Sequence, residues 1–111
     1  MAGELVNLNS IGAVGIITLN RPEARNALNP KMFQELSSAI QGCRDPDMRA
    51  VIITGSGGSF CAGADVKDFV NQLENSGPEG LHEHLKHLAD TFHRDVIIPI
   101  RQLDKPVIAD I

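Results

Sequence analysis

The segment that most constrains this chain is residues 50–66, where a strand, a tight turn and a helix start follow one another directly. Ala50–Thr54 is apolar and β-branched, which predicts a strand. Gly55–Ser59 predicts a glycine-rich turn, and Phe60–Asp65 leads into a helix expected from Val66. Turns and helix starts leave backbone N–H groups without partners, beside the positive end of the helix dipole. This segment can therefore hold a bound anion, or an oxyanion formed during a reaction.

Two common phosphate-binding motifs do not fit this turn. A P-loop needs Lys and then Ser or Thr after its last glycine, whereas Ala64 and Asp65 follow Gly63. A dinucleotide-binding G-x-G-x-x-G motif is excluded because Phe60 stands where the third glycine belongs. A purely structural interpretation stays open, in which the glycines make a turn and Asp65 caps the helix.

Composition excludes several classes of protein. The chain has 111 residues, 42% of them apolar, which is enough for a small domain with a core. Its net charge is −4 and it has no basic block, so nucleic acid is not an expected partner. No apolar run approaches the roughly 20 residues of a membrane span. The first four residues lead almost at once into a strand pattern, so we expect no signal or transit peptide.

The two cysteines, Cys43 and Cys61, both lie in apolar surroundings. A pair this sparse does not make a disulfide framework, and two buried thiols are typical of a reducing compartment. We therefore expect a cytoplasmic protein.

The N-terminal third predicts a hairpin followed by a helix. Leu5–Leu8 and Ala13–Leu19 read as strands with a turn at Gly12, and the second is apolar enough to be covered on both faces. Asn29 is a good helix N-cap and is followed by a proline suited to the first helical position. Apolar residues then recur at helical spacing, and the helix is expected to end near Gly42; they are Phe33, Leu36, Ile40 and Cys43.

The C-terminal part predicts helices and one strand. A short helix after Asp65 is followed by a polar loop, Glu74–Pro78, which is a plausible lip of a binding site. Apolar residues at steps of three and four then predict a helix from about Glu79 to Leu103, with a kink at Pro99. Lys105–Ala109 reads as the start of a buried strand.

Four histidines lie in the expected long helix. Zinc sites need converging ligands with an ordered second shell of partners. Only His84 and His87 are close to a shared helix face, and no cysteine accompanies them. We therefore interpret all four as solvated helix residues and expect no metal; they are His82, His84, His87 and His93.

Three segments in order resemble the crotonase family, the enoyl-CoA hydratase/isomerase superfamily. They are N-R-P…R-N-A-L over residues 20–28, F-x-x-G-x-D over residues 60–65, and K-P-x-I-A over residues 105–109. The resemblance implies an α/β fold of the ClpP/crotonase type, a spiral of ββα units. It also implies that residues 1–111 form the N-terminal part of a single crotonase-like domain.

The resemblance further implies a site for an acyl-CoA thioester. The backbone N–H of Ala64 would donate to the thioester oxygen in an oxyanion hole, and Gly63 would allow close approach. Asp65 would cap the helix and transfer no proton. Without the resemblance, Arg25 reads as a solvated loop arginine.

With the resemblance, Arg25 would meet a CoA phosphate. The same loop would touch the pantetheine arm, so Ala27 and Ala62 join Gly63, Ala64 and Asp65 in the expected CoA-binding set. No cofactor is implied, since CoA enters as part of the substrate.

The implied function is hydration of trans-2-enoyl-CoA in fatty-acid β-oxidation by a homotrimer or hexamer. A double-bond isomerase and a non-catalytic CoA-binding or assembly fragment are the alternatives. In the family a second oxyanion donor and the acid–base carboxylates lie beyond the position of Ile111, so we expect this chain alone to be inactive. This sequence departs from the family at Asp110, where the family usually has a small apolar residue. A carboxylate at this position would be costly if it were buried without a partner.

Overall fold

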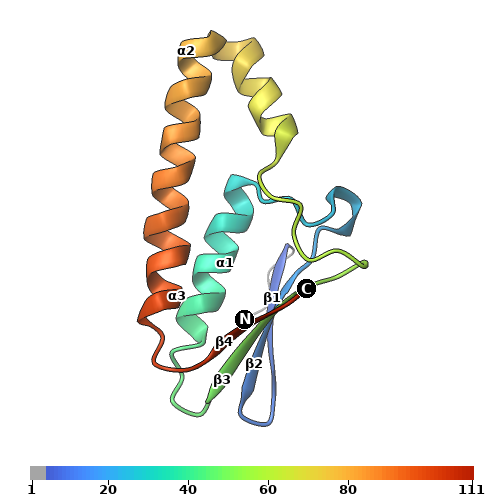
Figure 1. Cartoon of the computed structure of the whole chain (residues 1–111), viewed down its shortest axis with the longest axis vertical. Helices are drawn as coiled ribbons and strands as arrows, with labels where there is room; N and C mark the ends of the chain where they lie inside the picture. Colours follow the sequence, from blue (N-terminus) through green and yellow to red (C-terminus); the bar gives the residue numbers. More distant parts are fainter. Residues whose placement is uncertain (1–4) are drawn as a thin grey trace.

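The structure, a computed structural model, describes residues 5–111 as a four-stranded sheet with its helices on one side, the longest of which extends beyond the sheet (Figure 1). In sheet order the strands are β1 (Val6–Ile11), β2 (Val14–Leu19), β3 (Ala50–Gly55) and β4 (Val107–Asp110). β1 and β2 form the expected antiparallel hairpin, and β2, β3 and β4 run parallel. Helical crossovers connect the parallel strands, as such pairing requires. This is the predicted α/β class.

The core lies between the sheet and α1 (Pro30–Gly42). Asn29 caps this helix as predicted, since its side chain accepts a hydrogen bond from the N–H of Met32 at 2.9 Å. The inward face of β2 is fully buried, whereas its outward face is only half-buried, so coverage of both faces is not complete in residues 5–111. The core side chains are Val6, Leu8, Ile17, Leu19, Met32, Leu36, Ala39, Ile40, Cys43, Val51 and Val96.

The chain between β3 and β4 is more helical than the sequence predicts. α2 spans Val66–Phe92 and contains the segment expected to be a loop. Only Gly77 departs from helical geometry there, with φ 70° and ψ −176°. Gly77 adopts this conformation without a Cβ penalty, and Pro78 then begins a new helical turn, where its missing N–H costs little. The predicted loop is therefore a bend inside a helix.

The proline near the end of this region does not interrupt the helical path. A π-helical segment, η2 (His93–Ile97), precedes α3 (Ile98–Gln102). The N–H of Ile98 donates to the carbonyl of His93, five residues back. This wider turn accommodates Pro99, whose ring would clash with a regular helical carbonyl and which lacks an N–H. The sequence predicted a kink at Pro99; the structure instead has a π turn there, and the backbone on both sides of this turn stays helical.

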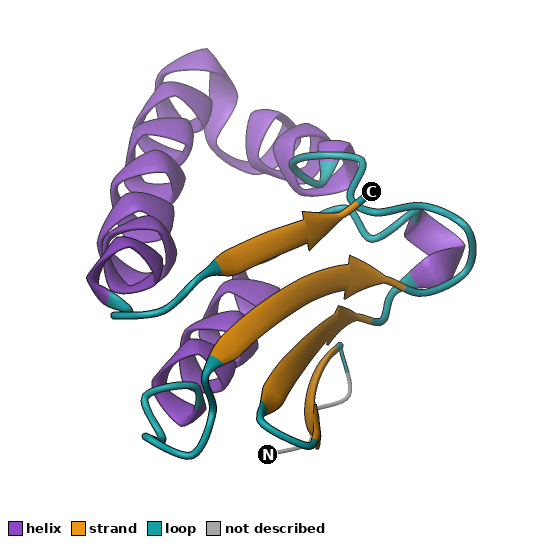
Figure 2. Cartoon of the chain, turned by 60° about the horizontal axis from the view of Figure 1, so that its bottom comes forward, coloured by secondary structure: helices purple, strands orange, loops and turns teal. Residues whose placement is uncertain are grey.

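The expectation that β4 is buried is wrong. Among the strands of residues 5–111, β4 pairs only with β3 and lies at the sheet edge, and Ile108 is 55% exposed (Figure 2). Asp110 is also exposed and accepts a hydrogen bond from the Thr54 hydroxyl at 3.2 Å, so its carboxylate carries no burial cost here. None of the helices in residues 5–111 combines the length and hydropathy needed to cross a bilayer.

Candidate functional site

The glycine-rich turn after β3 is held by Asn26, a residue that the sequence analysis did not single out. Its buried amide Nδ2 donates to the carbonyls of Ser56 at 3.0 Å and Ser59 at 2.8 Å, and its Oδ1 accepts from the N–H of Arg21 at 2.7 Å. Arg25 and Asn26 both adopt left-handed geometry, with φ 51° and 59°. Asparagine tolerates this conformation better than most residues. Asn26 thus joins the N-R-P loop to the glycine-rich turn.

Gly55 shows why this turn needs glycine. A Cβ at this position would overlap the carbonyls of Ser59 and Phe60 and would come within 2.7 Å of the Asn26 amide. The turn therefore closes onto its own backbone around the Asn26 side chain. A side chain at Gly55 would open the turn and displace the segment that follows it.

An isolated parallel bridge pairs Leu28 with Ala64 and positions the expected oxyanion donor. The Leu28 N–H donates to the Gly63 carbonyl at 2.7 Å, and the Asp65 N–H donates to the Leu28 carbonyl at 3.0 Å. Because a parallel bridge uses the neighbours of the bridging residue, the N–H of Ala64 points away from Leu28. Within residues 5–111 no hydrogen bond occupies this N–H. The Gly63 N–H is already directed to the Cys61 sulfur at 3.4 Å.

Asp65 caps α2, as predicted, and also forms an ion pair that was not predicted. Its Oδ1 accepts from the N–H of Lys67 at 3.1 Å, and its Oδ2 lies 3.1 Å from the Arg21 guanidinium. Arg21 also donates to the carbonyl of Ala27 at 3.0 Å. Both sides of the ion pair are largely buried. Arg21 therefore ties the loop before α1 to the start of α2.

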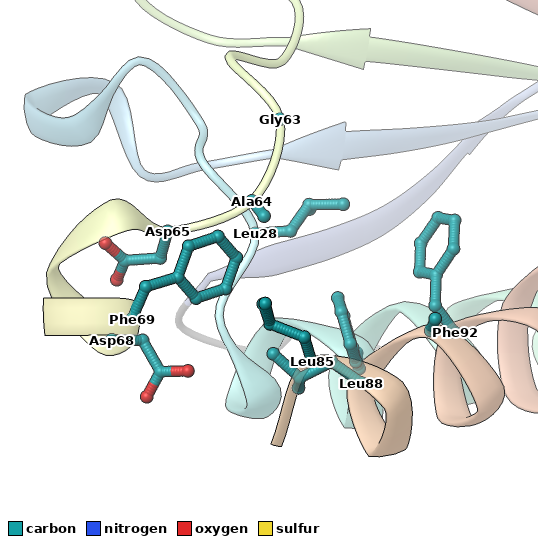
Figure 3. Close-up of a pocket in the computed structure, with 11 residues that line it drawn as sticks. Leu28, Gly63, Ala64, Asp65, Asp68, Phe69, Leu85, Leu88 and Phe92 are labelled. Atoms are coloured by element: carbon teal, nitrogen blue, oxygen red, sulfur yellow. The ribbon is translucent and has the colours of Figure 1, made fainter. Parts of the chain in front are cut away.

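Two pockets meet at Ala64 and Asp65. One, named here the basic pocket, has a volume of about 360 Å³ and a mixed lining, in which three basic residues, Arg21, Arg25 and Lys67, outnumber the acidic residues Glu23 and Asp65. The other has a volume of about 420 Å³ and an almost wholly apolar lining (Figure 3). The apolar pocket is lined by Leu28, Phe33, Gly63, Ala64, Asp65, Asp68, Phe69, Leu85, Leu88, Ala89 and Phe92.

The structure brings all the sequence-predicted site residues to this junction. Five of them line the basic pocket, and Gly63 lines the apolar pocket. The side chain of Arg25 is exposed and makes no ion pair with another residue in the range 5–111. The five that line the basic pocket are Arg25, Ala27, Ala62, Ala64 and Asp65.

The interpretation of the four histidines holds for three of them. His82, His87 and His93 are exposed, but His84 is largely buried and is paired with Asp68. In residues 5–111 no three side chains of the ligating types lie close enough to hold a metal ion together. Asp68 and His84 lie on opposite sides of the bend in α2 at Gly77. Their contact could not be predicted from residue spacing, because that spacing assumes a straight helix.

This arrangement suits a long ligand with two different ends. The basic pocket can receive an anionic group and the apolar pocket an aliphatic one, while the exposed Ala64 N–H lies where they meet. A polar atom at the middle of the ligand would lie beside this donor.

Comparison with known proteins assigns the chain to a family. The enoyl-CoA hydratase/isomerase family model matches residues 9–111. A Thermus thermophilus protein named as an enoyl-CoA hydratase is 38% identical over 99 residues, covering 88% of this chain and 37% of its own length. The chain belongs to the enoyl-CoA hydratase/isomerase family, the crotonase superfamily.

Solved structures agree in fold. The enoyl-CoA hydratase from Thermoplasma volcanium matches 96% of this chain and 40% of its own, with a TM-score of 0.78 and 33% identity. An enoyl-CoA hydratase/isomerase from Marinobacter aquaeolei gives the same coverage, TM-score and identity. The chain spans about a quarter to two fifths of the length of the curated relatives that it matches.

Proposed function

We propose that this chain binds an acyl-CoA thioester across the two pockets, as the CoA-binding part of an enzyme of the enoyl-CoA hydratase type. The reaction is hydration of a trans-2-enoyl-CoA in fatty-acid β-oxidation. The observation that carries the proposal is the free N–H of Ala64, which lies where a basic pocket meets an apolar one. A thioester joins an anionic nucleotide arm to an aliphatic chain, so its carbonyl would fall at this junction.

The basic pocket supplies charge for the CoA phosphates through Arg25 and Lys67. Arg21 lines the same pocket, but its guanidinium is committed to Asp65 and the carbonyl of Ala27. Arg25 and Lys67 are both exposed, and neither forms an ion pair with another residue in the range 5–111, so each can turn toward a ligand. Phosphate contacts of this kind weaken as salt screens them.

The chemical role falls on the Ala64 N–H. When water adds to a trans-2-enoyl thioester, its oxygen bonds to C3 as a base takes one of its protons, and the C2–C3 π electrons shift toward the thioester oxygen. An acid then gives a proton to C2 as the electrons return. A preorganised donor stabilises the intermediate negative charge, and removal of one such donor typically costs about 10²–10³ in rate.

Proton transfer is not assigned to the carboxylates beside Ala64. Asp65 caps α2 and pairs with Arg21, and Asp68 pairs with His84. Both are therefore held by other groups. General acid–base help is typically worth about 10²–10⁴, so we propose that residues 1–111 alone turn over enoyl-CoA far more slowly than an intact hydratase. This observation favours one second candidate, a CoA-binding module without catalysis.

The test is calorimetric titration of the purified chain with CoA and with a short trans-2-enoyl-CoA. Arg25→Ala should weaken binding of both ligands, and the loss should shrink at high salt. The matched control is Arg44→Ala, which removes an exposed arginine outside both pockets. Equal affinity of wild type and Arg25→Ala at low salt would exclude the phosphate contact.

Ala64→Pro tests the donor. The substitution removes an N–H that no hydrogen bond within residues 5–111 uses, so the Leu28 bridge should persist. Enoyl-CoA should lose affinity while CoA keeps most of it. A folded variant that binds both ligands as the wild type does would remove Ala64 from the site. Turnover of the wild-type chain at the rate of an intact hydratase would show that its acid–base groups lie within residues 1–111.

Two further parts of the proposal do not depend on the site. From the family we propose a homotrimer or hexamer of the full-length protein, and from the two free cysteines a cytoplasmic location. Light scattering of the purified protein measures the first, and microscopy of a tagged copy in cells measures the second. A monomer at high protein concentration would contradict the oligomer.

A further inference from the structure

α2 is bent at Gly77 into two legs that face the same pocket. The first leg is Val66–Ser76 and the second is Pro78–Phe92. Figure 1 shows the two legs diverging from the bend, with the loop that carries Ala64 at the free end of the first leg. Both legs line the apolar pocket, so the angle between them determines its width.

One ion pair joins the legs. Oδ2 of Asp68 on the first leg pairs with Nε2 of His84 on the second leg. The two side chains are only 26% and 16% exposed, respectively. A carboxylate hydrogen-bonds to the histidine ring whether the ring is neutral, with its proton on Nε2, or cationic. The pair therefore links one turn of the first leg to one turn of the second leg in either protonation state of the histidine.

The pair lies at the end of the apolar pocket nearest the bend. On the first leg the last lining residues are Asp68 and Phe69, and on the second leg the first is Leu85, next to His84. Residues between these positions, including those around Gly77, do not line the pocket. A chain that enters at Ala64 and extends toward the bend would therefore meet this pair.

The first leg has little else to hold it in place. None of its residues is fully buried, and Val66, Val70 and Leu73 on its apolar face are exposed. An exposed ion pair on a helix surface would add little stability, but this one is largely buried. It also satisfies a carboxylate that would otherwise face an apolar pocket without a partner, at a considerable cost.

We propose that the Asp68–His84 pair closes the apolar pocket and sets the longest acyl chain that the protein accepts. The inference rests on the proposed function, since it assigns the apolar pocket to the acyl chain. Asp68 and His84 are specificity-determining residues in this scheme and take no part in proton transfer. Their removal opens the pocket toward the bend and lets longer chains extend between the legs.

The test is a set of titrations with CoA, with saturated acyl-CoAs from four to sixteen carbons, and with free fatty acids of the same lengths. For wild type, affinity should rise about fourfold for each buried methylene and then stop rising once the chain reaches the pair. In the double variant Asp68→Ala, His84→Ala the rise should continue to longer chains, with a gain of tenfold or more for the longest.

Two controls separate the pair from general disturbance of α2. His84→Gln keeps a donor that can reach Asp68 and should restore the wild-type length limit. His82→Ala removes an exposed histidine from the same leg, outside the apolar pocket, and should leave the limit unchanged. If the double variant does not fold by circular dichroism, His84→Ala alone replaces it and should still lengthen the limit.

The outcomes distinguish this inference from the proposed function. An unchanged length limit in a folded variant, for acyl-CoAs and fatty acids alike, overturns the inference even when CoA binds. A limit that moves for fatty acids supports the inference even when CoA does not bind, and in that case the proposed function falls. A shift of the same size in His82→Ala would also overturn the role of the pair.

Discussion

The sheet with α1 and the bent helix α2 are stabilised in different ways. Apart from Val96 and Pro99, every fully buried residue in the range 5–111 lies between positions 6 and 51. α2 contains none over its 27 residues, and its first leg exposes an apolar face. The N-terminal half is therefore held by packing, and the legs of α2 by a cap, one ion pair and partly buried contacts.

This difference explains how the site is built. The packed half presents Leu28 and Asn26 from fixed positions, and they locate Ala64 through backbone and amide hydrogen bonds. The apolar pocket is lined in large part by α2, which has no fully buried residue. Ligand-binding segments are commonly drawn from regions with few buried contacts, because they must open and close.

The largest expected effect is on the core. Ile40→Ala removes a fully buried side chain of α1 and should lower the free energy of unfolding by about 2–5 kcal/mol. Leu73→Ala on the first leg of α2 removes a similar side chain that is 44% exposed, and should change the free energy of unfolding by under about 0.5 kcal/mol. Urea denaturation followed by circular dichroism measures both. Equal losses would show that α2 is packed as tightly as α1.

The next effect concerns a polar contact in the packed half. The Lys105 ammonium donates to three carbonyls after α1, those of Cys43 at 2.6 Å, Asp45 at 3.0 Å and Met48 at 2.6 Å. Lys105→Met keeps the aliphatic stem and leaves these carbonyls without their donor. We expect a loss of about 1.5–3 kcal/mol, as for hydrogen bonds to a charged group. Lys86→Met on the second leg of α2 is the control and should change stability little, because this lysine is exposed.

Asn26 tests how far the two regions depend on each other. Asn26→Ala leaves the carbonyls of Ser56 and Ser59 without their buried donor, at a cost of about 1–3 kcal/mol. It should also weaken acyl-CoA binding, since the turn that carries Ala64 loses its anchor. Asn75→Ala, at an exposed position of α2, is the control. Loss of stability with unchanged ligand affinity would mean that the turn is positioned without Asn26.

The sequence predicted the elements whose signals are local. The hairpin, the β3 strand and the Asn29 and Asp65 caps each depend on residues a few positions apart. Motif order predicted the family and the set of residues that surround Ala64. These features follow from periodicity, turn chemistry and capping, which act over short distances along the chain.

The features that were missed depend on contacts between residues distant in sequence. Asn26 lies 30 or more residues from the carbonyls that it binds, and Arg21 reaches Asp65. The Asp68–His84 pair depends on a bend at Gly77 that reads locally as a loop. Polar side chains have no periodic pattern that reveals their partners. The sequence likewise did not predict that Asn26 would be buried and would adopt left-handed backbone geometry.

The smallest expected effect is a difference in thiol reactivity between the packed half and the loop that carries Ala64, each of which contains one cysteine. Cys43 is fully buried in the core, whereas Cys61 is partly exposed in the loop before Ala64, and both are free thiols. A thiol reagent at pH 8 should label Cys61 rapidly. Cys43 should react only when the core unfolds, at a rate that urea accelerates. Rapid labelling of both would contradict the contrast between the packed half and the site loop.

The pH dependence of stability follows from the same contrast. Burial raises the pKa of the Cys43 thiol above its ordinary value, although the nearby Lys105 charge opposes the shift. The unfolded chain therefore loses this proton first as pH rises. Stability from the neutral thiol is complete below the unfolded pKa of about 8.5 and is lost as pH increases through the higher folded value. Above about pH 8.5 the unfolding free energy of wild type should thus fall by slightly more than that of Cys43→Ala. Identical pH profiles for wild type and Cys43→Ala, measured by urea denaturation, would show that Cys43 is not held neutral by the core.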